Sequence, residues 1–295
     1  MFVCTCFYGY ERQMLVFNGS YPGPRLEANW GDMLVILVTN ELTNNGTAVH
    51  WHGIRQQGSN QYDVPGLSDG LYGLHIIHGP ATADYDVDLG PIFMTDLYHQ
   101  SAFILWAQSG MYGGFPVRHN AVAPNGLING TNTFPCDDSD DPACLGTGKC
   151  SETVVQKGKK YRLRLLDAQA DGWMQFSIDG HKPTVIAADL VPIVPYRTDS
   201  VILTSGQRYD VIFEANQDIG TIRYEGASQV DPTFENDNPG SWLMHCHISW
   251  HTSESLALQF VEHQSEVPEL LASVSADFEL TCAKWETYYK SSLHK

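Results

Sequence analysis

The residues best suited to chemistry stand together near the C-terminal end of the chain, in the run HCHISWH at residues 245–251. In a β-strand successive side chains point to opposite faces, so His245 and His247 should face one side and Cys246 the other. A thiolate that shares a site with imidazoles is typical of blue copper, which accepts single electrons, and His251 stands five residues beyond the thiolate. The segment therefore predicts metal ligands on both of its faces.

Two other interpretations of this run stay open. It could be a polar strand end with incidental histidines, or it could bind zinc, although structural zinc prefers paired cysteines and no second cysteine lies at ligand spacing from Cys246. A second short motif, in which His50 and His52 flank a tryptophan, follows the strand-like run MLVILVTN. Its two imidazoles would face one side of a strand, toward a metal site shared with His245 and His247.

The elements that must position these motifs are β-strands. Short β-branched and aromatic runs recur between Gly, Asn, Asp and Pro turns, and helical periodicity is nearly absent. The runs are MLVILVTN, GLHIIHG, KYRLRLLD, MQFSIDG, PTVIAAD, DSVILTS, QRYDVIFEA and GTIRYE. This pattern is typical of Greek-key sandwiches with helix confined to minor connections, followed here by a tail that packs back on the surface.

Composition limits the partners of the chain. It has 295 residues, of which 43% are hydrophobic, enough for about two domains with cores of their own. With 34 acidic against 17 basic side chains the formal net charge is −17, which repels nucleic-acid phosphates and anionic lipids. No apolar run reaches the roughly 20 residues of a spanning helix, and the first residues do not resemble a signal peptide. We expect neither a nucleic-acid nor a membrane partner.

Cysteines and glycosylation patterns bear on the compartment. Cys136, Cys144 and Cys150 lie in a Gly-, Asp- and Pro-rich loop that a disulfide would staple under oxidising conditions. Three Asn-x-Ser/Thr patterns begin at Asn18, Asn45 and Asn129. Such patterns accept N-linked glycans in secreted proteins, so together these features favour an extracellular glycoprotein.

Over most of residues 11–262 the chain resembles the ascomycete-type laccases, secreted multicopper oxidases built from three cupredoxin sandwiches. The matching runs include VFNGSYPGPRLEANWGD, GTAVHWHGIRQ, DGLYGLHIIHGPATADYDVDLG, KYRLRLLDAQ, FSIDGH, GQRYDVIFEANQ and NPGSWLMHCHISWH. The resemblance implies one-electron oxidation of phenols at a blue copper, with electrons relayed to a trinuclear copper centre that reduces dioxygen to water. It implies four coppers, and we expect a monomer.

The resemblance also implies a role for each candidate residue. The metal ligands would be His50 on the type 2 copper, His52, His245 and His247 on the type 3 coppers, and Cys246 and His251 on the type 1 blue copper. Leu256 would take the axial position of the blue site, where a side chain that does not coordinate raises the potential relative to Met. Asp63 resembles the acid that feeds protons to the trinuclear centre, and Asp171 matches the carboxylate that binds a phenolic hydroxyl. A solvated turn residue is the alternative for both aspartates.

The chain departs from the family's pattern at two places. A second His-x-His pair is expected just before DGLYG, yet only GIRQQGSNQYDVPGLS separates that run from His52. A His-Pro-x-His-x-His stretch is expected in the third sandwich, yet TIRYEGASQVDPTF runs almost directly into NPGSWLMHCHISWH. About half of the family's histidine ligands are therefore missing, so we expect fewer than four coppers and a poor or inactive oxidase.

We therefore expect an all-β protein of tandem cupredoxin-like Greek-key sandwiches, the first incomplete and the third reduced to its last strands. The expected boundaries are 1–109 for the first sandwich, 110–228 for the second, 229–265 for the remnant of the third and 266–295 for the tail, with a linker near 107–120. The chain is then either an internally shortened laccase-type oxidoreductase or a non-catalytic copper-binding cupredoxin-like protein. In both cases His50 and His52 should lie close to the face of His245 and His247.

Overall fold

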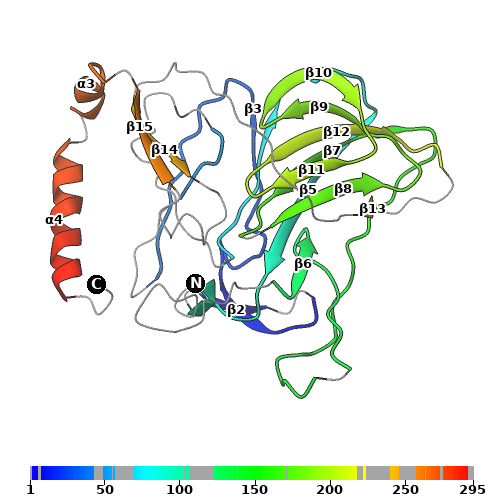
Figure 1. Ribbon diagram of the computed structural model, residues 1–295, viewed down its shortest axis with the longest axis horizontal. Coiled ribbons are helices and arrows are strands. Elements are labelled where there is room, and N and C mark those ends of the chain that lie inside the picture. The colour runs from blue at the N-terminus through cyan, green and yellow to red at the C-terminus, as the bar shows by residue number, and fades with distance from the viewer. Residues whose placement is uncertain are drawn as a thin grey trace. The chain divides into compact units, whose positions relative to one another are not determined.

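The computed structural model describes residues 2–5, 8–42, 49–54, 56, 70–102, 104–105, 123–137, 139–170, 172–217, 222–223, 240–245, 257–262, 264–272 and 275–291. Within these residues most of the regular structure is β-strand, with few helices, which confirms the expected all-β class (Figure 1). The chain divides into two compact units, one formed by residues 1–47, 66–229 and 246–255 and the other by residues 48–65, 230–245 and 256–295. The boundaries expected for three sandwiches and a tail stay a prediction.

The first unit is built around a six-stranded sheet in the order β10-β9-β12-β7-β5-β6 (Figure 1). Its strands are β5 (Val87–Leu97), β6 (Asn125–Ile128), β7 (Lys160–Asp167), β9 (Thr184–Ala188), β10 (Val191–Arg197) and β12 (Arg208–Glu214). β5 and β7 run parallel, whereas the other neighbours in this sheet are antiparallel. A second sheet orders β11 (Val201–Thr204), β8 (Trp173–Ile178) and β13 (Ile222–Arg223).

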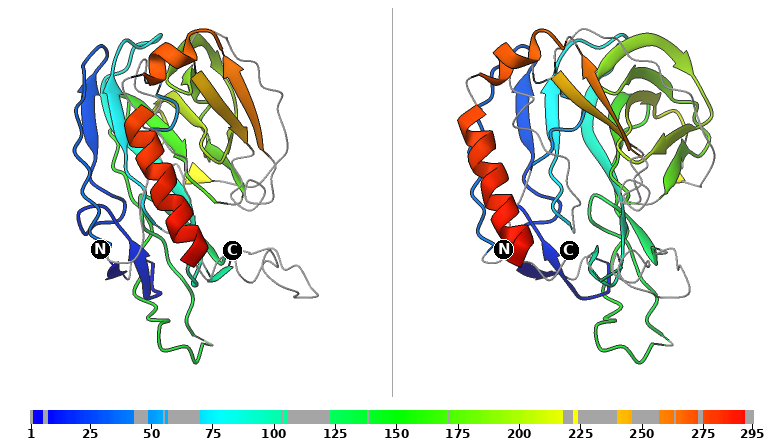
Figure 2. Two further views of the ribbon diagram at one scale, coloured as in Figure 1. Left: turned by 90° about the vertical axis from the view of Figure 1, so that its left-hand side faces the viewer. Right: turned by 60° about the vertical axis from the view of Figure 1, so that its left-hand side comes forward.

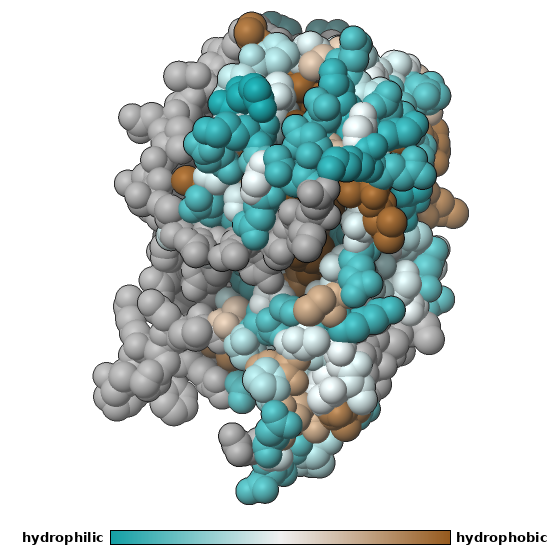
Figure 3. Space-filling model, turned by 90° about the vertical axis from the view of Figure 1, so that its right-hand side faces the viewer, coloured by the Kyte–Doolittle hydropathy of each residue, from teal (hydrophilic) through white to brown (hydrophobic). Residues whose placement is uncertain are grey.

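Alternating side chains join these two sheets into a sandwich. In β8 every second residue is buried, namely Met174, Phe176 and Ile178, as expected of a strand with one face on a core. These side chains share a cluster of buried residues with Leu163 and Leu165 of β7, which is buried over most of its length because strands flank it on both sides. The surface in Figure 3 is largely hydrophilic over its described residues, with scattered hydrophobic side chains, in keeping with the acidic composition.

Two buried arginines on β7 are paired with carboxylates from the neighbouring strands. Arg164 Nη2 lies 2.7 Å from Asp88 Oδ2 of β5, and the guanidinium of Arg162 donates to Asp210 of β12. Burial alone would raise the pKa of Asp88, but the hydrogen bond and positive charge of Arg164 outweigh that effect and lower it. A buried charge without a partner would be costly, so these pairs fix how β5, β7 and β12 align.

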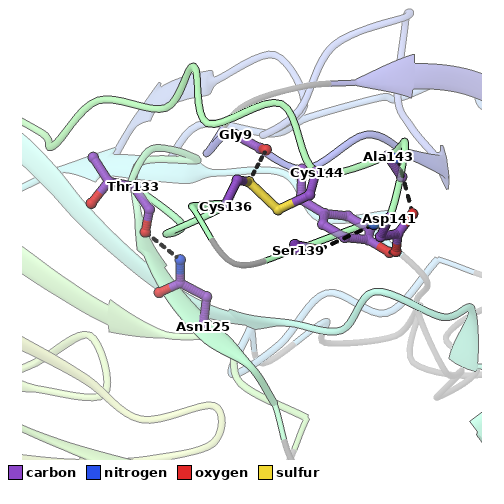
Figure 4. Close-up of a disulfide and its surroundings, with 9 residues drawn as sticks. Gly9, Asn125, Thr133, Cys136, Ser139, Asp141, Ala143 and Cys144 are labelled. Atoms are coloured by element: carbon purple, nitrogen blue, oxygen red, sulfur yellow. Dashed lines mark hydrogen bonds between the residues drawn. A yellow bond between two sulfur atoms is a disulfide. The ribbon is translucent and has the colours of Figure 1, made fainter.

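A disulfide-closed loop packs on the N-terminal segment of the first unit. Cys136 and Cys144 are joined, which confirms the expected staple, and Cys150 is free and exposed (Figure 4). The carbonyl oxygen of Gly9 lies 3.6 Å from Cys136 Sγ and accepts a hydrogen bond from the backbone N–H of Leu145 at 2.6 Å. The loop therefore fixes the chain just before β2 (Arg12–Leu15), which pairs with β1 (Phe2–Thr5).

The second unit combines a two-stranded ladder with helices. β14 (Gly240–His245) pairs antiparallel with β15 (Ala257–Glu262), and α3 (Val267–Leu271) and α4 (Ser275–Ser291) follow (Figure 2). The 17-residue α4 was not predicted, and each of its side chains whose burial is described is exposed. The expected packing of the tail on the surface stays a prediction. The helices among the described residues are too short or too polar to cross a bilayer.

The strand expected at residues 33–40 does not form. Nearby, β3 (Leu26–Asn29) pairs parallel with β4 (His75–His78), but no described strand pairs with residues 33–38, here called the 33–38 segment. The side chains of Met33, Val35 and Leu37 are 91–92% exposed. An apolar run favours a strand only when other chain segments cover it, and local sequence cannot supply that cover.

Candidate metal centre

His50 and His52 are the predicted ligands whose side chains the structure describes. Nε2 of His50 lies 3.3 Å from Nδ1 of His52, and the two rings are nearly perpendicular at 87° with centroids 5.2 Å apart. Both nitrogens could bind a single ion at the imidazole–metal distance of about 2.0–2.1 Å, because that distance permits a nitrogen separation of this size. One of the facing nitrogens carries the shared proton, which must leave before both bind metal.

The backbone of this motif is a turn and not the expected strand. The N–H of Ile54 donates to the carbonyl oxygen of Trp51 at 3.1 Å, and Gly53 has a φ of 72°, a left-handed conformation that favours glycine. The strand prediction is therefore wrong here, because a turn closes directly after the first histidine. The two imidazoles nevertheless meet, through the turn and not through strand alternation.

The strand that leads to the second motif is β14, which ends at His245, the register partner of Ala257 in β15. Six other candidates lie outside the described residues, namely Asp63, Asp171, Cys246, His247, His251 and Leu256. The linker expected near residues 107–120 also lies outside the described residues. Among the residues that the structure describes, no group of three or more His, Cys, Asp or Glu side chains could hold a metal ion. The ligand roles of the second motif stay predictions.

Several other histidines have ordinary packing roles. His78 Nε2 lies 2.9 Å from Glu27 Oε2 on the surface, and Nδ1 of His181 lies 2.8 Å from the carbonyl oxygen of Asp179. His99 stacks on Tyr10 with ring centroids 3.4 Å apart and planes 8° apart. Burial lowers the pKa of His99, which favours a neutral ring in this aromatic stack.

Two buried carboxyl groups, Asp96 and Asp167, flank the segment that carries Asp171. Asp96 is 7% exposed and Asp167 is 2% exposed. Burial raises the pKa of Asp167 to about 8; the hydrogen bond from the N–H of Gln169 opposes this rise, and the negative charge of Asp96 adds a smaller effect that raises the pKa. Sequence analysis missed both residues. The available signal was that Asp167 ends the strand-like run KYRLRLLD and so belongs to the strand itself, not to the turn after it.

Comparisons with known proteins identify the family. Two family models, both described as multicopper oxidase, match residues 4–121 and 88–245. Laccase-2 of Botryotinia fuckeliana is 31% identical over 497 positions, which cover 97% of this chain and 84% of that protein. Oxidoreductase OpS5 of Beauveria bassiana is 46% identical over 242 residues, or 70% of this chain and 40% of that protein. The laccase crystal structure from Botrytis aclada has a TM-score of 0.85 at 30% identity and covers 100% of this chain and 92% of that chain.

The comparison with Laccase-2 also shows a difference in length. Its 497 positions exceed the 295 residues of this chain, so at least 202 of them have no counterpart here. This agrees with the two interruptions that the sequence shows after His52 and before β14. The family model at 88–245 nonetheless spans more than half of the chain, and the similarity to Laccase-2 extends over nearly all of it. The chain therefore belongs to the multicopper oxidase family, whose members are copper-dependent oxidoreductases.

Proposed function

We propose that this chain is an internally shortened laccase-type oxidase, which accepts single electrons from phenolic substrates and passes them to dioxygen, with impaired turnover. The observation that carries the proposal is the match with Laccase-2, which extends over 97% of this chain while at least 202 positions lack a counterpart. Such a match supports a common ancestry for the whole chain. The missing positions support the loss of ligands that the sequence predicts.

The donor chemistry of the described residues fits copper in part. Imidazole nitrogens are suitable copper ligands, and His50 and His52 bring two of them within 3.3 Å. The further proposed ligands are His245, Cys246, His247 and His251. Copper, when bound, supplies reversible one-electron chemistry. Asp171 would bind the phenolic hydroxyl, Asp63 would pass protons toward the site of dioxygen reduction, and Leu256 would line the blue site without coordinating.

Impairment follows from the number of ligands. Loss of residues that merely orient ligands typically costs about 10–100-fold in metal affinity or activity, and loss of the ligands themselves should cost more. Half of the family's histidines have no counterpart here, so each remaining ion would be under-ligated and open to water. We therefore propose that fewer than four coppers bind.

The proposed setting of the protein is extracellular. Asn18 and Asn129 are exposed, as glycan acceptors must be, although Asn129 Oδ1 also accepts a hydrogen bond from the N–H of Phe93 at 2.8 Å. The partners would be a phenolic small molecule and dioxygen, with neither nucleic acid nor membrane. The proposed domains keep the boundaries 1–109, 110–228, 229–265 and 266–295.

Copper loading tests the proposal. The purified chain would be supplied with copper, and its metal stoichiometry, its thiolate-to-copper absorption and its oxygen uptake with a phenol would be measured. We expect fewer than four coppers and no sustained uptake. Cys246→Ser should abolish the absorption, whereas the matched control Cys282→Ser, a free and exposed thiol on α4, should keep it. Four coppers with steady uptake would contradict impairment, and equal absorption in both variants would contradict the role of Cys246.

A second candidate is a non-catalytic copper-binding cupredoxin-like protein. The contact between His50 and His52 favours it, because two imidazoles can hold one ion without completing a larger centre. One firmly bound copper with no oxygen uptake at any phenol concentration would support this alternative. Genomic sequence near the codons for residues 65–68 and 233–236 distinguishes the shortened oxidase from the non-catalytic copper-binding protein. Exons that encode the missing histidines there would indicate a shortened product of an active oxidase gene.

A further inference from the structure

Tyr10 lies opposite the disulfide-closed loop of residues 136–144, to which the backbone around it is tied. The N–H of Glu11 donates to the carbonyl oxygen of Ala143 at 2.7 Å, and Tyr10 itself faces Cys144 in an antiparallel bridge. Cys144 is one end of the disulfide, so the loop that it closes is covalently held beside the tyrosine. The loop therefore determines which side chains meet the Tyr10 phenol.

The phenol of Tyr10 shares a short hydrogen bond with a carboxylate of this loop. The Tyr10 hydroxyl donates to Asp141 Oδ2 at 2.5 Å, and Asp141 Oδ1 accepts the N–H of Ala143 at 2.9 Å, which fixes the carboxylate within the loop (Figure 4). The bond to Asp141 raises the pKa of Tyr10, and the same bond, followed by that from Ala143, lowers the pKa of Asp141. The pair is therefore a neutral phenol that points its proton at an ionised base.

Aromatic side chains surround the Tyr10 ring. The ring of His99 stacks on it with centroids 3.4 Å apart and planes 8° apart, and Phe134 meets it edge-on at 6.0 Å. Tyr8, which is 1% exposed, lies 6.4 Å from it. Burial lowers the pKa of His99, which favours a neutral imidazole. Neutral π faces attract positive charge, so this stack favours the electron-poor ring that loss of an electron would create.

The outer side of the loop is acidic. Asp137, Asp140 and Asp141 are exposed, and the whole chain carries a formal net charge of −17. A surface of this charge raises the local concentration of cations, and dissolved salt screens that attraction. Tyr10 is only half-buried beside these carboxylates. A cationic co-reactant therefore reaches its ring more readily than an anionic one.

We propose that Tyr10 is a redox-active tyrosine that gives one electron to a cationic one-electron oxidant in solution, with Asp141 as the acceptor of its proton. The electron leaves the phenol ring and lowers the charge of the oxidant by one. The hydroxyl proton crosses the hydrogen bond to Asp141 Oδ2, which leaves a neutral phenoxyl radical on Tyr10 and a neutral carboxyl group on Asp141. A positioned base assists such a step because an oxidised phenol is a strong acid. The step uses none of the proposed copper ligands.

Flash oxidation of the full chain tests the role of Tyr10. Tris(bipyridine)ruthenium(III) would be generated by a light pulse, and the tyrosyl radical would be followed by its absorption and its electron paramagnetic resonance. We expect a fast phase that Tyr10→Phe removes, since phenylalanine keeps the ring beside His99 but lacks the hydroxyl. Tyr196→Phe is the matched control, because Tyr196 is 48% exposed and no described carboxylate accepts a hydrogen bond from it. A fast phase that persists in Tyr10→Phe overturns the proposal.

The role of Asp141 is tested by the rate of the same phase. Asp141→Asn keeps oxygen acceptors for Ala143 and Tyr10 but replaces the base with a far weaker one, so oxidation should slow about 100-fold, the lower end for a positioned base. Asp199→Asn, at a side chain that is 80% exposed, should keep the wild-type rate. The wild-type phase should also slow in deuterium oxide, which a merely structural aspartate would not cause. Equal rates in wild type and Asp141→Asn overturn the transfer of the proton to Asp141.

Ionic strength tests the preference for a cationic oxidant. The fast phase with the ruthenium complex should slow as salt is added, and a double change of Asp137→Asn and Asp140→Asn should slow it at low salt. A rate that is independent of both overturns this preference. Should Tyr10→Phe not fold, radical trapping and peptide mapping of the wild-type chain decide. Label at Tyr10 supports the proposal, and label at Tyr196 in its place overturns it.

Discussion

The ionisation of Asp167 should influence the stability of the folded chain. Its pKa is about 8 in the folded protein, above the value of about 3.9 of an aspartate in an unfolded chain. Between these values the folded state keeps a proton that the unfolded state has lost. The free energy of unfolding that this group contributes is therefore full below about pH 4 and is lost as pH rises through about 8, by at most about 1.4 kcal/mol per pH unit.

Asp167→Asn should remove this part of the pH dependence. We expect the variant to gain stability over wild type steadily from about pH 4 to about pH 8 and then to keep a constant difference, because only the wild type must bury a second charge. Chemical denaturation at several pH values measures the difference, with Asp199→Asn as the control on an exposed aspartate. Parallel stability curves for wild type and Asp167→Asn would rule the assignment out.

Single residues differ in how far their partners can be predicted from sequence. His50 and His52 are two positions apart, so the sequence was sufficient to predict their contact. A turn, and not the expected strand, brings them together. Asp96 and Asp167 are far apart in sequence and come together only because β5 and β7 pair in parallel. No local pattern encodes that pairing, and Asp167 alone resembles an ordinary aspartate at a strand end.

At the level of elements, strands with simple alternation were predicted and irregular ones were not. β8 and β11 alternate between buried and less buried residues, so their runs MQFSIDG and DSVILTS are recognisable in isolation. β5 was missed because Gly90 and Pro91 interrupt its sequence, and the ladder indeed shifts register between Asp88 and Gly90. At residues 33–40, by contrast, a strand was predicted that does not form. The apolar pattern there is strong, but no described strand pairs with it.

Removal of α4 should leave the rest of the fold intact. Trp285 and Leu280 are 59% and 55% exposed, and a helix that buries so little apolar surface adds little to stability. Deletion of residues 273–295 should change the free energy of unfolding by less than about 1 kcal/mol, measured by denaturation, and should remove helical circular dichroism. Leu165→Ala, at a fully buried position of β7, is the positive control and should cost about 2–5 kcal/mol. A comparable loss on deletion of α4 would show that the helix packs after all.

For the whole molecule, sequence identified the class and the family but not the arrangement into units. Greek-key composition and the matching runs indicated a multicopper oxidase, and the family models agree. The division into two units joins segments that are distant in sequence, such as residues 48–65 with 230–245. Such a division depends on contacts between distant segments, and sequence periodicity carries no information about them.

Self-association should depend on the 33–38 segment. Leu37 is 92% exposed within a run of six apolar residues that has no charge, high strand propensity and no proline, which are features of segments that pair between chains. Leu37→Lys should lower the aggregated fraction at high concentration, measured by light scattering, with little effect on the folded state. Val154→Lys, at a position that is 91% exposed in a run of only two apolar residues, is the matched control. Equal aggregation of the two variants would locate the cause elsewhere.

The same segment has a consequence for the life of the protein in a cell. Chaperones bind chains that expose extended apolar stretches, and proteases remove molecules that such chaperones cannot release. A chain that displays six apolar side chains even when folded would be treated by this machinery as unfinished. Its abundance would then be set by retention and degradation, whatever the stability of its sandwich core.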